Sequence, residues 1–233
     1  FLVSTSAQPS LALLISPLIS MDAFGAKQAV LRLVGTFEGR SVTNRDVVLD
    51  ELVDKALTKS KEQGFAEYGS EAFVQSLNRT LVEMMVSSEA QNFGVARLTD
   101  GEIDGGLSEV KNRIQSQGQA KAQVSKLGLT DASIKEAVQR KLRAQKFIKY
   151  KTSSSFVEVS DEEAFSYFNK NKSRFGNMSF ETFRPSIKKF LGQKNADDRI
   201  RDWIEVLKRK YKVRNFLNEN LIYGLPNSAN TNP

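Results

Sequence analysis

Apolar side chains recur at helical spacing along most of this chain, and capping signals mark where several of these repeats begin. The most apolar run covers residues 71–92, where apolar side chains occupy more than one helical face. Two Ser/Thr-x-x-Glu patterns, Thr99 with Glu102 and Ser160 with Glu163, are typical of capping boxes at helix starts. The sequence therefore predicts a mainly α fold built from amphipathic helices.

Strand signals are confined to the two ends of this helical region. Residues 30–37 are rich in apolar and β-branched side chains, and a turn is expected over residues 37–40, before Thr43 caps the first helix. A second short strand is expected over residues 213–216. We therefore predict one or two short β-strands, in which the N-terminal strand pairs with the C-terminal one and packs the two ends of the chain together.

Further boundaries are expected in the second half of the chain. Gly128 should end a short helix, and Thr130 or Asp131 should begin the next one. An apolar face over residues 180–191 predicts a helix. Pro185 is expected either to kink this helix or to restrict it to the first turns. A separate helix should follow over the stretch NADDRIRDWIEVLKRKYKVRNF.

The chain contains neither histidine nor cysteine. Imidazole bases, thiol nucleophiles, disulfides and zinc sites made of these ligands are therefore excluded. Carboxylate runs such as residues 161–163 and 197–198 lie at predicted helix starts or on exposed faces, where negative charge has a structural role and no nucleophile accompanies it. We expect no catalytic residue, no metal site and no cofactor.

A net charge of +7 would attract nucleic acid, an anionic membrane surface or an acidic polypeptide equally. The segment KRKYKVR mixes an aromatic ring with positive charge, but it is too short to specify nucleic acid, so no nucleic-acid partner is expected. Apolar runs fall short of the ~20 residues that span a bilayer. No transmembrane segment is expected either.

Several segments resemble one family when they are taken in order. LVGTFEGRSVTNRDV is similar to the opening strand, turn and helix entry of the SurA and PrsA group of extracytoplasmic chaperones. LVEMMVSSEAQNFGVARLTDGEID, KLGLTDASIKEAVQRKLRAQKFI and VSDEEAFSYFNKNKSRF resemble the helices that follow in that group. The resemblance covers residues 30–215, and the order of the motifs is more specific than any one of them.

The resemblance also indicates a missing part. In this family the helix over residues 160–175 commonly leads into a parvulin-type prolyl isomerase domain, whose site uses histidines. Here the chain passes almost directly into SFETFRPSIKKFLGQKNADDRIRDWIEVLKRKYKVR, which resembles the segment that returns after that domain and packs on the N-terminal helices. The resemblance implies a non-catalytic periplasmic chaperone that binds unfolded or partly folded polypeptides, with outer-membrane protein precursors as the expected clients.

The expected organisation has four parts. Residues 1–26 are either the end of a secretory signal peptide or an N-terminal arm, and these two alternatives stay open. Residues 27–175 correspond to the SurA-like helical chaperone domain, and residues 176–217 complete its core with C-terminal helices and a strand. Residues 218–233 are polar and are expected to form a flexible tail.

Candidate binding residues follow from a cradle of helices that exposes an apolar patch beside basic side chains. The candidates for peptide binding are Leu81, Met84, Met85, Phe93, Phe147, Phe165 and Phe168. Methionine side chains adapt to varied partners, although Met84 and Met85 fit a role as core residues better. The candidates for a basic patch that steers acidic clients are Arg140, Lys141, Arg143, Lys146 and Lys149, for which a solvated helix face is the stronger alternative.

A scaffold protein is the alternative function. It would reuse the chaperone fold for one fixed partner, and the apolar arm at residues 11–21 suggests a homodimer formed by arm exchange.

Overall fold

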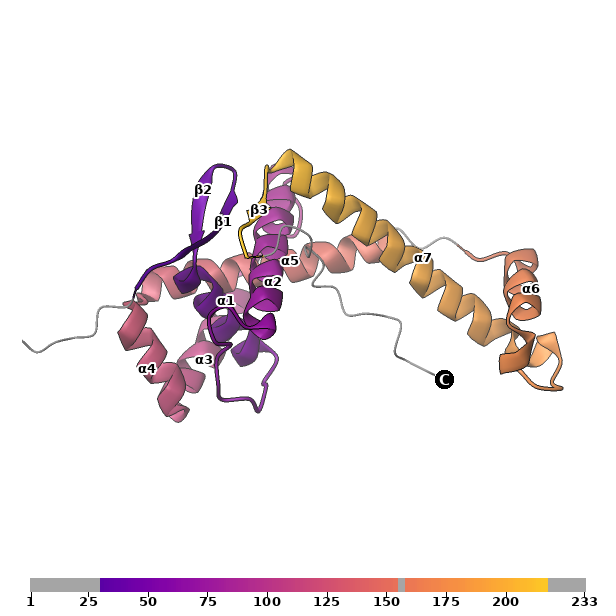
Figure 1. The fold of residues 1–233 in the computed structure, drawn as a ribbon, viewed down its shortest axis with the longest axis horizontal. Coiled ribbons are helices and arrows are strands. Elements are labelled where there is room, and N and C mark those ends of the chain that lie inside the picture. Colours follow the sequence, from indigo (N-terminus) through magenta and orange to yellow (C-terminus); the bar gives the residue numbers. More distant parts are fainter. Residues whose placement is uncertain (1–29, 155–157, 218–233) are drawn as a thin grey trace, which may run out of the picture.

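The computed structural model describes residues 30–154 and 158–217, which form a mainly helical fold with a small sheet (Figure 1). The predicted fold class, mainly α with a few short strands, is confirmed. The strands are β1 (Leu33–Phe37), β2 (Arg40–Thr43) and β3 (Arg214–Asn215). The helices are α1 (Asn44–Leu57), α2 (Glu71–Asn92), α3 (Asp100–Ser116), α4 (Gly118–Leu127), α5 (Asp131–Ser154), α6 (Asp161–Lys170) and α7 (Phe180–Lys210), with a short 3-10 turn at Lys172–Arg174. The expected arm or signal segment and the expected tail fall outside the described residues.

The sheet has the strand order β2-β1-β3, and both pairings are antiparallel. β1 and β2 form a hairpin whose two turn residues, Glu38 and Gly39, have φ values of 50° and 77°, as a tight hairpin turn with the right-handed strand twist requires. β3 pairs with the other side of β1, with Gly35 opposite Asn215. The predicted pairing between the two ends of the chain is confirmed. β2 was not predicted as a strand, because it is four residues long and buries only Val42.

The helix boundaries follow the capping residues. Thr99 and Glu102 form the predicted capping box in both directions, and Gly128 ends α4 with a φ of 58°. Ser160 Oγ accepts a hydrogen bond from the Glu163 N–H, as predicted, but the Glu163 carboxylate accepts from Asn195 instead of closing the box. This contact ties the start of α6 to the middle of α7.

The C-terminal helix differs from the sequence expectation. Residues 180–210 form one continuous helix of 31 residues, where two helices were expected. Pro185 lies within the first two turns of α7, where its missing N–H removes one hydrogen bond, and the helix continues beyond it. At ~1.5 Å per residue this helix is about 46 Å long. It is therefore long enough to join two separate packing units.

Most helices form a body with two adjoining cores. The first core joins β1, α2, α5 and the C-terminal half of α7 around side chains such as Phe73, Leu77 and Leu207. The second joins α1, α3, α4 and α5 around side chains such as Leu52, Val110 and Val138. α5 contributes side chains to both cores, so it is the central helix of the body.

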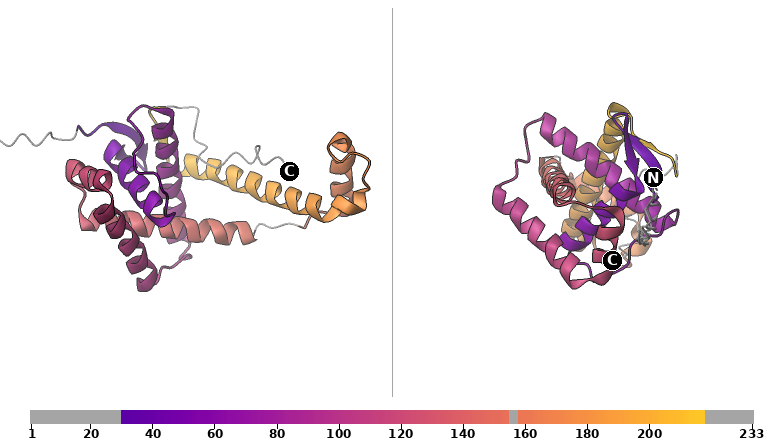
Figure 2. Two further views of the ribbon diagram at one scale, coloured as in Figure 1. Left: turned by 90° about the horizontal axis from the view of Figure 1, so that it is seen from below. Right: turned by 90° about the vertical axis from the view of Figure 1, so that its left-hand side faces the viewer.

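A third, smaller cluster lies at the far end of α7, which we call the tip (residues 158–191). α6 packs against the N-terminal part of α7, and Val159, Ala164, Phe168, Ile187 and Leu191 are buried between them. Figures 1 and 2 show α6 and the start of α7 at one end of the molecule, away from the body. The tip includes residues on both sides of position 175, where the sequence suggested a boundary.

Candidate functional site

The tip concentrates aromatic side chains. Seven of them contact one another in pairs, with ring centroids between 4.9 and 6.4 Å apart: Phe165, Tyr167, Phe168, Phe175, Phe180, Phe183 and Phe190. Only Phe168 is buried. Phe165 is 49% exposed and Phe190 is 40% exposed, so the cluster presents ring surface to solvent.

The helical spacing explains why these rings gather. Phe165 and Phe168 are three residues apart on α6, and Phe180 and Phe183 are three residues apart on α7, so each pair lies on one helical face. Phe175, after the 3-10 turn, stacks on Phe168 with centroids 4.9 Å apart. The small buried interior of the tip cannot cover so many rings, and those at its rim stay partly exposed.

A second group of aromatic side chains lies on the body, where α2 ends beside α5 and α7. We call it the body patch (Phe93, Phe147, Tyr150 and Trp203). Phe147 is buried at its centre and contacts the other three rings, with centroids 5.6–6.5 Å away. Phe93 and Tyr150 are 66% and 57% exposed, so the body patch also presents aromatic side chains to solvent.

The residues predicted to bind peptides divide between these places and the cores. Leu81, Met85 and Phe147 belong to the first body core and Phe168 to the tip core, so these four side chains are not available to a partner in this structure. Phe93 and Phe165 are exposed in the body patch and the tip. Met84 is half-buried and lines a polar cavity.

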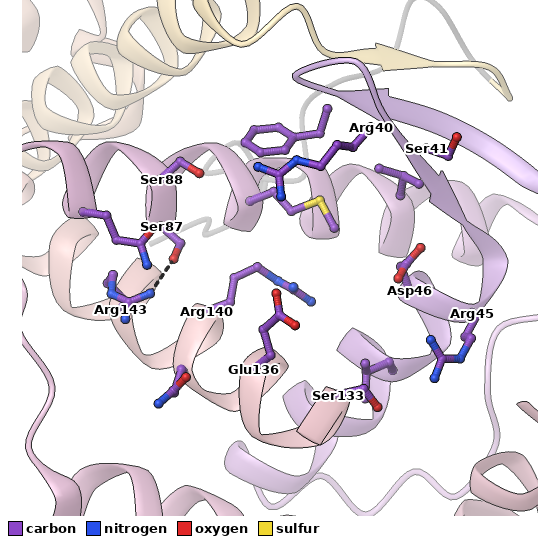
Figure 3. A pocket seen from close by; sticks show the side chains of 16 residues that line it. Arg40, Ser41, Arg45, Asp46, Ser87, Ser88, Ser133, Glu136, Arg140 and Arg143 are labelled. Carbon is purple, nitrogen blue, oxygen red and sulfur yellow. Dashed lines mark hydrogen bonds between the residues drawn. The ribbon is translucent and has the colours of Figure 1, made fainter. Parts of the chain in front are cut away.

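That cavity, which we call the arginine pocket, has a volume of about 370 Å³ and lies between the hairpin, α1, α2 and α5. Arg40, Arg45, Arg140 and Arg143 line it, as do Ser41, Ser87, Ser88 and Ser133 (Figure 3). Asp46 and Glu136 are the carboxylates in its wall. Arginine side chains thus outnumber acidic ones in the lining.

The residues predicted as a basic patch do not form one surface. Arg140 pairs with buried Asp50, and Lys141 is itself buried between Asp54 and Glu83. Arg143 donates to Ser87 Oγ at 3.3 Å inside the arginine pocket. Lys146 is exposed and binds the Glu102 carboxylate, and Lys149 is exposed. Only the last two lie on a solvated helix face.

Lys141 and Arg140 belong to a buried charge network between α1, α2 and α5. Desolvation by burial, together with repulsion from Asp50, raises the pKa of Glu83 from 4.5 to about 7. Burial also raises the pKa of Asp50, although Arg140 opposes the change. Arg79 also lies 3.8 Å from Asp54 at the edge of the network. Burial thus favours the protonated forms of Glu83 and Asp50, although cations lie beside them.

Sequence reasoning missed several of these residues. Tyr150 and Trp203 were not assigned to a surface, although both occur on predicted helices beside Phe147. The sequence places Arg40 in the predicted turn and Arg45 at the predicted helix start, and only the folded hairpin brings them near α5. The density of phenylalanine between residues 165 and 190 was the signal that could have identified the tip as a surface.

Within residues 30–154 and 158–217, no helix is long and apolar enough to cross a membrane. In the same part of the chain, no group of three or more acidic side chains is arranged to hold a metal ion. A scan of protein-family models, a search of curated proteins and a search of solved structures return no match for this chain.

Proposed function

We propose that this protein is a non-catalytic chaperone of the SurA-like type, which binds unfolded or partly folded polypeptides. The observation that carries the proposal is the tip, where seven aromatic side chains cluster and most remain partly exposed. Stable folds rarely expose large contiguous apolar patches, and those that do occur commonly mark interaction surfaces.

Aromatic rings suit this role for two reasons. They bury large apolar areas on contact, and they lose little side-chain entropy because few bonds rotate. Basic side chains at the tip, including Lys172, Arg174 and Lys189, are exposed around the rings. Weak apolar contacts flanked by positive charge would hold varied chains without reading one sequence.

The arrangement of α7 agrees with the arrangement that the family resemblance implies. The chain leaves the body after α5, forms the tip and returns along α7, whose C-terminal half packs on α2 and α5. β3 then adds to the N-terminal strand. The periplasm as location and outer-membrane protein precursors as clients are parts of the proposal that rest on this resemblance.

The test measures fluorescence anisotropy of a labelled, unfolded outer-membrane-protein segment titrated with the whole chain at low and moderate salt. We expect binding that survives salt, because the tip contacts are apolar. The double variant Phe165→Ser/Phe190→Ser should bind about tenfold more weakly, since each ring contributes roughly 0.5–1.5 kcal/mol. The same variant should also suppress aggregation of the segment less well.

Phe216→Ser is the matched control, because Phe216 is 39% exposed and lies outside both aromatic surfaces. Equal loss of affinity in this control and in the tip variant would contradict the assignment to the tip. Absence of any binding to unfolded segments would refute the chaperone function. Dimerisation that depends on the tip rings, without client binding, would instead support the scaffold alternative.

A further inference from the structure

The arginine pocket lies along the free edge of a strand. In the described sheet β2 is an edge strand, since its one strand neighbour is β1. Arg40, Ser41 and Val42 of β2 all line the pocket. Phe37, which lies opposite Arg40 on β1, lines the pocket as well. Successive side chains of a strand point to opposite faces, so Phe37, Arg40 and Val42 share one face of the hairpin and Ser41 lies on the other. The cavity therefore extends under the hairpin and reaches the free edge of β2. Such an edge offers backbone N–H and C=O groups to an extended chain, except for the Thr43 N–H, which donates to Asp46 Oδ2.

Two of the arginines in the pocket are held by neutral acceptors. Arg45 donates to the backbone oxygens of Leu127 and Gly128, each at 3.0 Å, and Arg143 donates to Ser87 Oγ. Neither forms an ion pair within the described residues. Burial without a compensating carboxylate lowers the pKa of Arg143. These guanidinium groups therefore keep the capacity to bind an anion.

The carboxylates of the wall do not neutralise these arginines. Asp46 Oδ2 accepts hydrogen bonds from the Thr43 N–H and hydroxyl, both at 2.8 Å, as part of the cap of α1. Glu136 is exposed. Arg140 pairs with Asp50. Among residues 30–154 and 158–217, Arg40 pairs only with exposed Glu38, a contact that costs little to break.

The rest of the lining is rich in hydrogen-bond donors. Ser41 and Ser88 line the same cavity, whereas the Ser133 hydroxyl in its wall already donates to the Thr130 carbonyl oxygen. Figure 3 shows Arg40 above the cavity and Arg140 and Arg143 on α5. A ligand that complements this wall must supply mainly acceptors. A planar carboxylate matches the forked donors of a guanidinium group.

We propose that the arginine pocket binds an acidic residue of an extended polypeptide, whose backbone lies along the free edge of β2 and whose carboxylate is held by Arg143. This site would give the chaperone, if the proposed function holds, a preference for acidic segments of its clients. The carboxylate comes either from an Asp or Glu side chain or from a free C-terminus. Both sources offer the same chemistry to the pocket.

The experiment uses the whole chain and short labelled peptides of alternating Thr and Val, acetylated and amidated, with one central Glu or Gln. A third peptide carries the central Gln and a free C-terminal carboxylate. We expect the Glu peptide to bind about tenfold more tightly than the amidated Gln peptide, because charge-assisted hydrogen bonds contribute about 1.5–3 kcal/mol. If the third peptide binds as tightly as the Glu peptide, the pocket also accepts the carboxylate of a free C-terminus.

The Arg143→Gln variant should abolish the difference between the Glu and Gln peptides. Lys135→Gln is the matched control, since Lys135 is an exposed cation on the same helix and outside the pocket. Equal binding of the two amidated peptides, or a preference that survives Arg143→Gln, would overturn the proposal. If Arg143→Gln weakens binding of inorganic phosphate and leaves the peptides unaffected, the pocket is a small-oxyanion site and the peptide proposal fails.

The pocket proposal and the proposed chaperone function can be tested separately. Binding of the unfolded outer-membrane-protein segment should depend on Phe165 and Phe190 and should persist in Arg143→Gln. Loss of the tip-dependent binding with an intact Glu preference would refute the chaperone proposal alone. The reverse result would refute the pocket proposal alone.

Discussion

Acidification from about pH 8 to pH 5 should stabilise this protein, although most proteins change little or lose stability over such a range. The reason is Glu83, whose side chain is 14% exposed and lies between α1, α2 and α5 beside Asp50 and Lys141. The chain has no histidine, so side chains with ordinary pKa values hardly titrate in this window. The pH dependence should therefore report on the buried network.

The magnitude follows from the pKa of Glu83, which burial raises from 4.5 to about 7. Between these two values the folded state binds more protons than the unfolded state, so the free energy of unfolding falls as the pH rises. At ~1.4 kcal/mol per pH unit, the full difference is about 3 kcal/mol, of which about 2.5 kcal/mol is lost between pH 5 and pH 8. Asp50 changes the stability in the same direction, because burial raises its pKa as well.

The assay is urea unfolding followed by far-UV circular dichroism at several pH values, for the wild-type protein and for Glu83→Gln. The amide keeps the size of the side chain and an acceptor for Lys141 but carries no charge. We expect the variant to lose most of the pH dependence and to exceed the wild type in stability at pH 8. Glu158→Gln serves as the control, since Glu158 is exposed.

The reasoning would be refuted if the free energy of unfolding of the wild type stayed constant or rose from pH 5 to pH 8. It would also be refuted if Glu83→Gln were destabilising at both ends of the range. Either result would mean that Lys141 and Arg140 neutralise the carboxylates fully, so that the network is stable in its ionised form.

Two further predictions concern contacts that close the fold. In Gly35→Ala the added Cβ would lie 2.5 Å from a backbone oxygen of β3. Pairing of β1 with β3 should therefore weaken, and the free energy of unfolding should fall by about 2 kcal/mol. Urea unfolding tests this, with Gly105→Ala, a helical position with open space around it, as the control. Tyr211→Phe removes the hydroxyl that donates to Glu89 Oε2 at 2.6 Å, so the free energy of unfolding should fall by about 2 kcal/mol. Tyr150→Phe, at an exposed ring, should leave the urea unfolding midpoint unchanged.

Local signals predicted the fold well where they act through the backbone. The caps at Thr43, Thr99 and Gly128 depend on residues within one turn of each other, so the sequence contains all the information that they require. β2 was missed because its hairpin is stabilised by contacts with β1 and α1. Pro185 does not end the helix as expected, because packing of α7 against α6 stabilises the helix around it.

The candidate sites were less predictable because they depend on how helices pack. Whether Phe147 or Phe93 is buried is decided by which elements meet at the end of α2, and the local sequence does not contain this information. Likewise Lys141 is indistinguishable in sequence from Lys149, yet one is buried beside carboxylates and the other is exposed. Helical periodicity identified the faces, but it did not identify their partners.

The pairing of β3 with β1 has a consequence for how the chain folds as it is synthesised. The second body core consists of residues 48–142 and can form once α5 is made. The first core also needs Ile200, Ile204, Leu207, Tyr211 and Val213, which are five of its seventeen buried side chains and are synthesised last. Contacts across such long loops form late. The nascent protein therefore passes through a stage in which Phe73, Leu77 and Leu81 on α2 are uncovered, and β3 completes the sheet last.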